Sequence, residues 1–368
     1  MTIILDRRSF VQGASSAFAA GAFSSFAGRA SAGTPAELRV SMSGGNWGDA
    51  IISAYVKPFE VENGIKVTPI LRDVGSTQVQ LMVKTNNVTV DVVNGTQLSA
   101  VKIGQAGLLE KIDYSIFKQE DLDGIPEHFR APYGFASYVY SLNMFYNANK
   151  FPASRPRPVS WAEFWDVNKF PGTRSLPNGQ SGDLGPWEEA LLADGVAADA
   201  LYPMDVDRVF ASLDKIKPHI RKWWTTGAEI LQIMRDDVAD LGLSYDGRAN
   251  SLVDSGAPIE ISRKQVKLNW DHWYIPKGSP NAESAQKFIA STARPDRQAV
   301  FAKLIAQSPS NRNAYKMISE EVARKLATNP AYAANSYPMD AKWYTEVGSD
   351  GLSNIQRLQQ RWTKWIVL

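Results

Sequence analysis

The chain has 368 residues, a formal net charge of +2 at pH 7 and no cysteine. The lack of cysteine excludes disulfides, thiolate metal sites and a lipidated N-terminal cysteine. The nearly neutral charge provides no basic face for phosphates or anionic lipids, so neither nucleic acid nor a membrane surface is an expected partner.

The first 32 residues are predicted to be an export signal. Residues 6–12 read Asp-Arg-Arg-Ser-Phe-Val-Gln, which is typical of a twin-arginine signal peptide. A weakly apolar stretch follows at 13–28, and a small-x-small cleavage site lies at 30–32. The twin-arginine translocase is therefore an expected partner, and the mature protein is expected to begin near Gly33 in the periplasm. No second apolar run reaches membrane-spanning length, which predicts a soluble mature protein.

Beyond the signal peptide, short apolar runs alternate with amphipathic stretches, the pattern of an α/β fold. In chain order the pattern predicts a strand at 38–42, a helix at 49–63, strands at 65–70 and 88–93, a helix ending near 106, a capped helix from 160, a strand at 238–245, a helix from near 248, an extended segment at 267–275 and a helix at 281–292. About 336 residues exceed one comfortable core, which predicts two lobes. Because no low-complexity linker separates them, we expect the chain to cross between the lobes more than once.

Seven segments of the chain share a distinctive order and spacing: 63–67, 90–93, 107–113, 131–134, 160–165, Trp270-Asp271 before Ile275-Pro276, and Arg294-Pro295-Asp296. In this order and spacing they resemble the periplasmic spermidine/putrescine-binding proteins. The resemblance covers about residues 38–313. It implies the two-lobed type II periplasmic binding protein fold, with a ligand cleft between the lobes and delivery of the ligand to the permease of an ABC importer.

The same resemblance implies the domain boundaries. Lobe one is expected at 36–140 plus 273–308, and lobe two at 141–272. A C-terminal helical segment, 309–368, is expected to pack on the lobes. The strands that cross between the lobes are expected near 138–144 and 269–274, and the protein is expected to be a monomer.

Loops that follow the predicted strands indicate where a ligand binds, because ligands of open α/β sheets lie at the carboxyl ends of strands. Trp47 follows the first strand behind two glycines and offers an aromatic wall. Thr96 follows the third strand and offers a hydroxyl. The run 245–248, Tyr-Asp-Gly-Arg, follows a later strand and places a carboxylate beside an aromatic ring.

Aromatic faces and carboxylates are what an amine ligand requires. Under the resemblance, the aromatic-box and carboxylate positions fall on Trp47, on Asp246 or Tyr245, and on Asp271. Asp271 is the strongest candidate, since an acid in an aromatic strand would be costly without a cation. Trp47 could instead fill a lobe edge, and Asp246 could instead cap a helix.

Three further predictions concern arginine and tryptophan. Arg248 is a candidate ligand clamp, with a solvated helix residue as the alternative. Trp223 and Trp224 must point to opposite sides of a strand, so either could lie in the core with the other near the cleft, and Trp223 is taken as the cleft candidate. Five other tryptophans at helical spacing are expected in the core: Trp161, Trp165, Trp343, Trp362 and Trp365.

The predicted ligand is a small amine of the putrescine or spermidine kind. Two departures from the family favour an alternative. Residues 177–182 replace an acidic cluster and leave only Asp183 nearby, and Arg248 and Arg221 flank the predicted cleft. A zwitterionic ω-amino acid such as 4-aminobutyrate, or an opine, is therefore the alternative ligand, with arginine holding the carboxylate.

An enzyme is not expected. The three histidines have no metal-ligand spacing, and no nucleophile elbow or P-loop motif occurs, so no metal site and no cofactor are predicted. A periplasmic hydrolase using Asp246 and Asp271 ranks below the binding protein. A ferric-ion binder ranks last, because the chain has no Tyr-Tyr pair.

Overall fold

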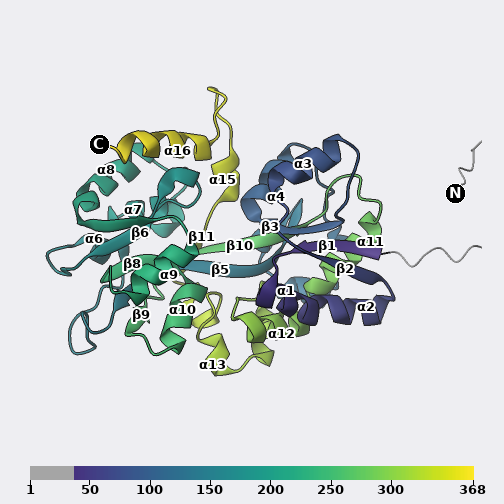
Figure 1. Cartoon of the computed structure of the whole chain (residues 1–368), viewed down its shortest axis with the longest axis horizontal. Helices are drawn as coiled ribbons and strands as arrows, with labels where there is room; N and C mark the ends of the chain where they lie inside the picture. Colours follow the sequence, from purple (N-terminus) through teal and green to yellow (C-terminus); the bar gives the residue numbers. More distant parts are fainter. Residues whose placement is uncertain (1–36) are drawn as a thin grey trace, which may run out of the picture. The chain divides into compact units, whose positions relative to one another are not determined.

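One mixed sheet runs through the molecule (Figure 1). The computed structural model describes residues 37–368, and within them the main path of an eleven-stranded sheet is β2-β1-β3-β10-β5-β8-β6-β7. The strands are β1 Glu37–Met42, β2 Lys66–Leu71, β3 Val92–Thr96, β4 Arg130–Ala131, β5 Gly134–Asn147, β6 Arg174–Pro177, β7 Ile220–Trp224, β8 Leu241–Tyr245, β9 Ile259–Ile261, β10 Val266–Tyr274 and β11 Ser336–Pro338. The predicted signal peptide lies outside the described residues.

Helices pack around both halves of the sheet, one half on each side of the central strands β5 and β10 (Figure 1). They are α1 Gly45–Ile51, α2 Lys57–Asn63, α3 Ser76–Lys84, α4 Gln97–Gln105, α5 Gln119–Asp123, α6 Trp161–Trp165, α7 Trp187–Ala193, α8 Val206–Ile216, α9 Gly227–Arg235, α10 Asp246–Asp254, α11 Ala282–Thr292, α12 Pro295–Ile305, α13 Glu320–Ala323, α14 Pro330–Ala333, α15 Ala341–Thr345 and α16 Asn354–Trp365. None of the helices formed by residues 37–368 is long and apolar enough to span a bilayer.

The long strands β5 and β10 occupy the centre of the sheet. They pair antiparallel from Leu142 opposite Lys267 to Phe135 opposite Trp273. The path continues from β10 to β3 and β1 on one side, and from β5 to β8 and β6 on the other. Both segments expected to cross between the lobes are therefore strands, and they are hydrogen-bonded to each other.

Buried apolar side chains form separate cores on the two sides of this central pair. Lobe one is built on β1, β2 and β3, with Val40 and Phe59 in its core. Lobe two is built on β6, β7 and β8, with Trp187 and Leu213 in its core. The two-lobed α/β fold expected from the sequence is confirmed. The five tryptophans assigned to the core are buried, Trp165 only partly.

Two predicted elements differ from the structure in their bounds. The strand predicted at 88–93 begins at Val92, the first residue that pairs with β1, and the carboxylate of Asp91 before it accepts from the backbone N–H of Arg39 at 2.8 Å. The helix predicted at 49–63 begins four residues earlier, at Gly45, and continues through a π-helical turn at Ile52–Val56 into α2.

Candidate functional site

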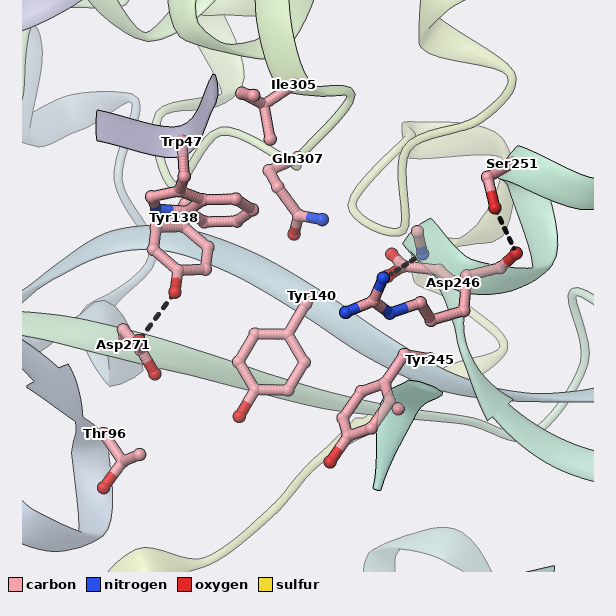
Figure 2. Close-up of a pocket in the computed structure, with 13 residues that line it drawn as sticks. Trp47, Thr96, Tyr138, Tyr140, Tyr245, Asp246, Ser251, Asp271, Ile305 and Gln307 are labelled. Atoms are coloured by element: carbon pink, nitrogen blue, oxygen red, sulfur yellow. Dashed lines mark hydrogen bonds between the residues drawn. The ribbon is translucent and has the colours of Figure 1, made fainter. Parts of the chain in front are cut away.

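A cavity of about 570 Å³ lies where the two lobes meet the central strands (Figure 2). Lobe one contributes Trp47 and Thr96, and lobe two contributes residues from the start of α10. The structure brings six of the seven predicted site residues to this cavity, namely Trp47, Thr96, Tyr245, Asp246, Arg248 and Asp271. The strand-end loops therefore do converge, as the α/β pattern predicted.

A row of aromatic rings lines the cavity. The Trp47 ring lies 4.8 Å from that of Tyr138, measured between centroids. The Tyr138 and Tyr140 rings are 6.3 Å apart, and those of Tyr140 and Tyr245 are 6.1 Å apart. Figure 2 shows the three tyrosines side by side along the cavity. Such a row suits methylene groups and attracts cations through the ring faces.

Asp271 lies at the Tyr138 end of the row. On β10 it is opposite Thr96 of β3 and Tyr138 of β5, whose hydroxyl donates to Asp271 Oδ2 at 2.6 Å. Burial raises the pKa of Asp271 to about 6, although the Tyr138 hydrogen bond opposes this effect. Asp271 Oδ1 accepts no hydrogen bond from residues 37–368, so this oxygen is available to an ammonium group.

Asp246 is placed differently. It is the first residue of α10, and Tyr245 is the N-cap, so Asp246 does not take the capping position that was the alternative to a place in the site. Its Oδ1 accepts from the Gly247 N–H at 2.8 Å, and its Oδ2 lies 3.1 Å from the Ser141 hydroxyl, whose single proton is closer to Asn143 Oδ1. Burial raises the pKa of Asp246 to about 6, and the Gly247 N–H and the charge of Arg263 oppose the rise. Asp246 is only 1% exposed, so the protein encloses this carboxylate more fully than that of Asp271.

Arg248 lies at the other end of the aromatic row. It is exposed on the first turn of α10. Its Nε and the Tyr245 ring both lie beside Gly227, and a Cβ added to Gly227 would lie 3.1 Å from Arg248 Nε. None of the ion pairs formed within the described part of the chain includes Arg248. The cavity therefore holds a cation whose charge is not neutralised by a neighbouring carboxylate.

Sequence reasoning missed Tyr138, Tyr140 and Gln307. The two tyrosines are two apart in the predicted crossover strand, so a period of two could have indicated a shared face. No local pattern indicates Gln307, which lies in a loop after α12. Its position depends on the next residue, Ser308, which exchanges backbone hydrogen bonds of 2.8 and 3.0 Å with the distant Val139.

Two buried polar atoms in the cavity wall have no hydrogen-bond partner among residues 37–368: Trp47 Nε1 and Gln307 Oε1. Figure 2 shows the Gln307 amide directed into the cavity.

The assignment of Trp223 to the cleft is wrong. Its ring packs 5.0 Å from that of Trp362 and 5.7 Å from that of Trp365, both on α16. Trp224 is fully buried, and its ring lies 5.7 Å from that of Tyr245. The C-terminal helix therefore covers the outward face of β7 and places Trp224 behind the cavity wall. Arg221, on the same strand, does not line the cavity either.

In residues 37–368, no three His, Asp or Glu side chains converge in a way that could hold a metal ion. The polar groups of the cavity are two carboxylates, one guanidinium, hydroxyls and an amide. This set can hold a small polar molecule by charge and hydrogen bonds, with aromatic rings against its apolar part.

The chain is similar to proteins of one family. The family model for bacterial extracellular solute-binding proteins matches residues 54–334. A gamma-aminobutyric acid-binding protein of Pseudomonas aeruginosa is 32% identical over 333 residues, covering 89% of this chain and 90% of that protein. A spermidine/putrescine-binding periplasmic protein of Salmonella typhimurium is 24% identical over 311 residues, covering 82% and 86%.

Among solved structures, the PBP AgtB from A. tumefaciens R10, in complex with agropinic acid, is 32% identical with a TM-score of 0.68. The aligned region covers 91% of this chain and 100% of the AgtB chain. The resemblance to the polyamine binders therefore extends to relatives with other ligands, and these relatives are transport proteins that bind solutes. The chain belongs to the family of bacterial extracellular solute-binding proteins, as the periplasmic solute-binding component of an ABC transporter.

Proposed function

We propose that the protein captures a small ω-amino acid of the 4-aminobutyrate kind. One observation carries the proposal: a single cavity holds an unpaired guanidinium, Arg248, and an available carboxylate oxygen, on Asp271, at the two ends of an aromatic row. Asp271 would hold the ligand's ammonium group and Arg248 its carboxylate. The methylenes would lie against Tyr140.

The charges favour this ligand over a diamine. A diamine requires a carboxylate at each end, but Asp246 is only 1% exposed and its Oδ1 already accepts from the Gly247 N–H. The unpaired Arg248 would also repel a second ammonium group. The relative described as binding gamma-aminobutyric acid is 32% identical, against 24% for the polyamine-binding relative, which supports the same choice.

Calorimetric titration of the purified mature protein tests the proposal. The ligands are 4-aminobutyrate, its shorter and longer ω-amino acid homologues, putrescine and agropinic acid. We expect an ω-amino acid to bind, putrescine to bind weakly or not at all, and Arg248→Ala to lower ω-amino acid affinity by at least tenfold. The matched control is Arg221→Ala, which removes a guanidinium outside the cavity. Putrescine binding that Arg248→Ala leaves unchanged would contradict the proposal.

We also propose that the twin-arginine route exports the protein and that it works as a monomer with lobe boundaries near residues 140 and 272. The pair Arg7 and Arg8 supports the export route. Changing both to lysine should leave the precursor in the cytoplasm, as measured by fractionation. Normal accumulation of that variant in the periplasm would contradict the route.

A further inference from the structure

A second cavity, of about 420 Å³, lies at the junction of the lobes and is lined by the neighbours of Asp271. Asp271 lines the first cavity, whereas Trp270 and His272 line the second, as expected for side chains that alternate along a strand. Other parts of the wall come from lobe one, with Val101 of α4, from lobe two, with Ala198 and Tyr202, and from residues 338–342.

The C-terminal segment 336–345, called the strap below, forms one wall of this second cavity with its residues 338–342. It begins with β11, which pairs parallel with β10 at residues 266–268, and it continues into α15. A backbone hydrogen bond of 3.0 Å from Met339 to Leu268 extends the pairing. The strap is therefore attached along the strand that joins the lobes.

Buried charges fix the strap to lobe two. Lys267 Nζ lies 2.8 Å from Glu188 Oε2 and 3.0 Å from Glu189 Oε2, and the three side chains are at most 2% exposed. From the strap, the Tyr344 hydroxyl donates to Glu188 Oε1 at 2.6 Å and that of Tyr337 to Glu189 Oε1 at 3.3 Å. These contacts tie together β10, α7 and the strap.

The strap also packs against lobe one. Helix α15 packs against α4, and Leu98 of α4 belongs to the same buried apolar group as Tyr344 and the core of lobe two. The N-cap of α4 is Thr96, which lines the first cavity, and Gln97 Nε2 donates to Asn269 Oδ1 at 2.6 Å. A shift of the strap therefore acts on a helix that begins at the candidate ligand site.

We propose that the strap and the cavity beneath it control how far the two lobes turn about β5 and β10, and thereby set ligand affinity. Strands that cross between lobes act as a hinge, so closing the first cavity opens the second. Material that fills the second cavity opposes its collapse and favours the state that is closed around the ligand. The effect on affinity rests on the proposed function, but the effect on lobe position does not.

The first experiment fills the second cavity. Ala198 is exposed on lobe two and lines this cavity, whereas Ala200 is exposed in the same short 3-10 helix and does not. Because the chain has no cysteine, Val61→Cys on lobe one and Arg155→Cys on lobe two provide a unique spin-label pair. Pulsed electron spin resonance then measures the distance between the lobes with and without 4-aminobutyrate.

We expect Ala198→Trp to shift the distance distribution of the unliganded protein and to tighten 4-aminobutyrate binding by about fivefold or more. Ala200→Trp should leave both unchanged. Identical distance distributions for the two variants would overturn the proposal, whether or not any ligand binds. A shift without any binding of 4-aminobutyrate would support the strap and count against the proposed ligand.

The second experiment loosens the strap. Tyr344→Phe and Tyr202→Phe each remove one hydroxyl that donates to Glu188 Oε1, but only Tyr344 belongs to the strap. We expect Tyr344→Phe to broaden the distance distribution and Tyr202→Phe to leave its width unchanged. Equal broadening in the two variants would show that any lost hydrogen bond to Glu188 loosens the lobes, whether or not it comes from the strap. This result would overturn the proposal.

Discussion

Two regions of the molecule hold the same charges, two carboxylates and one cation, under opposite conditions. They are the cavity group Asp246, Asp271 and Arg248, and the buried group Glu188, Glu189 and Lys267. In the buried group the cation lies within 3.0 Å of both acids, and water is excluded. In the cavity the guanidinium has no acidic partner. The comparison teaches that charges already paired inside the protein support the fold, whereas charges left unpaired in a cavity are available to a ligand.

Breaking the buried group should have the largest effect. Lys267→Met leaves two carboxylates without their cation, so we expect a loss of about 3 to 5 kcal/mol in the free energy of unfolding. Chemical denaturation at pH 7 measures it. Arg248→Met is the matched control in the cavity and should change the free energy of unfolding by less than about 0.5 kcal/mol. Similar losses in both variants would remove the distinction between the two regions.

Neutralising Asp271 should act on the ligand instead of the fold. Asp271→Asn keeps the shape and removes the charge, so we expect ω-amino acid affinity to fall by about 2 to 4 kcal/mol. Asp246→Asn is the comparison, and it should have a smaller effect, because Asp246 is only 1% exposed and its Oδ1 already accepts from the Gly247 N–H. Titration calorimetry measures both variants. Unchanged affinity in Asp271→Asn would exclude this carboxylate as the ammonium partner.

The pH dependence of binding sharpens the same contrast. Burial raises the pKa of Asp271 to about 6, so below pH 6 the unliganded protein holds a proton that an ammonium ligand must displace. Affinity should therefore be constant from pH 7 to 8 and fall by up to about tenfold between pH 6 and pH 5. Titrations across this range in the parent and in Asp271→Asn test it. A slope that persists in Asp271→Asn would assign the proton to another group.

The smallest effect is expected for the titration of Glu189, which should change the pH dependence of the melting temperature. Burial raises the pKa of Glu189 to about 7, against the opposing charge of Lys267. A carboxyl group whose pKa is raised on folding binds its proton more tightly when folded. Its stabilising contribution is therefore complete below about pH 4.5, near the unfolded pKa, and is lost as the pH rises through 7. Glu189→Gln should flatten the decline of the melting temperature between pH 5 and 8, and an unchanged decline would contradict this assignment.

Local pattern was enough to predict part of the fold and part of the candidate site. Strand-end loops are local in sequence, so Trp47, Thr96 and Tyr245 could be placed at the cavity by the carboxyl-end rule alone. The direction of Trp223 could not be predicted, because it depends on α16, which lies about 140 residues later in the chain and covers that face of β7. Gln307 was missed for the same reason, since a backbone pairing between Ser308 and Val139 positions it.

The pairing of β3 with β10 determines when the protein can fold. Residues 93–96 find their partners at 271–274, and α12, at residues 295–305, packs against α1. Lobe one therefore cannot complete its sheet until most of the chain has left the ribosome, and its contacts are formed across long sequence separations, which makes folding slow. Until then the incomplete lobe exposes apolar surface and unpaired strand edges, so the unfinished chain is open to proteases and to aggregation.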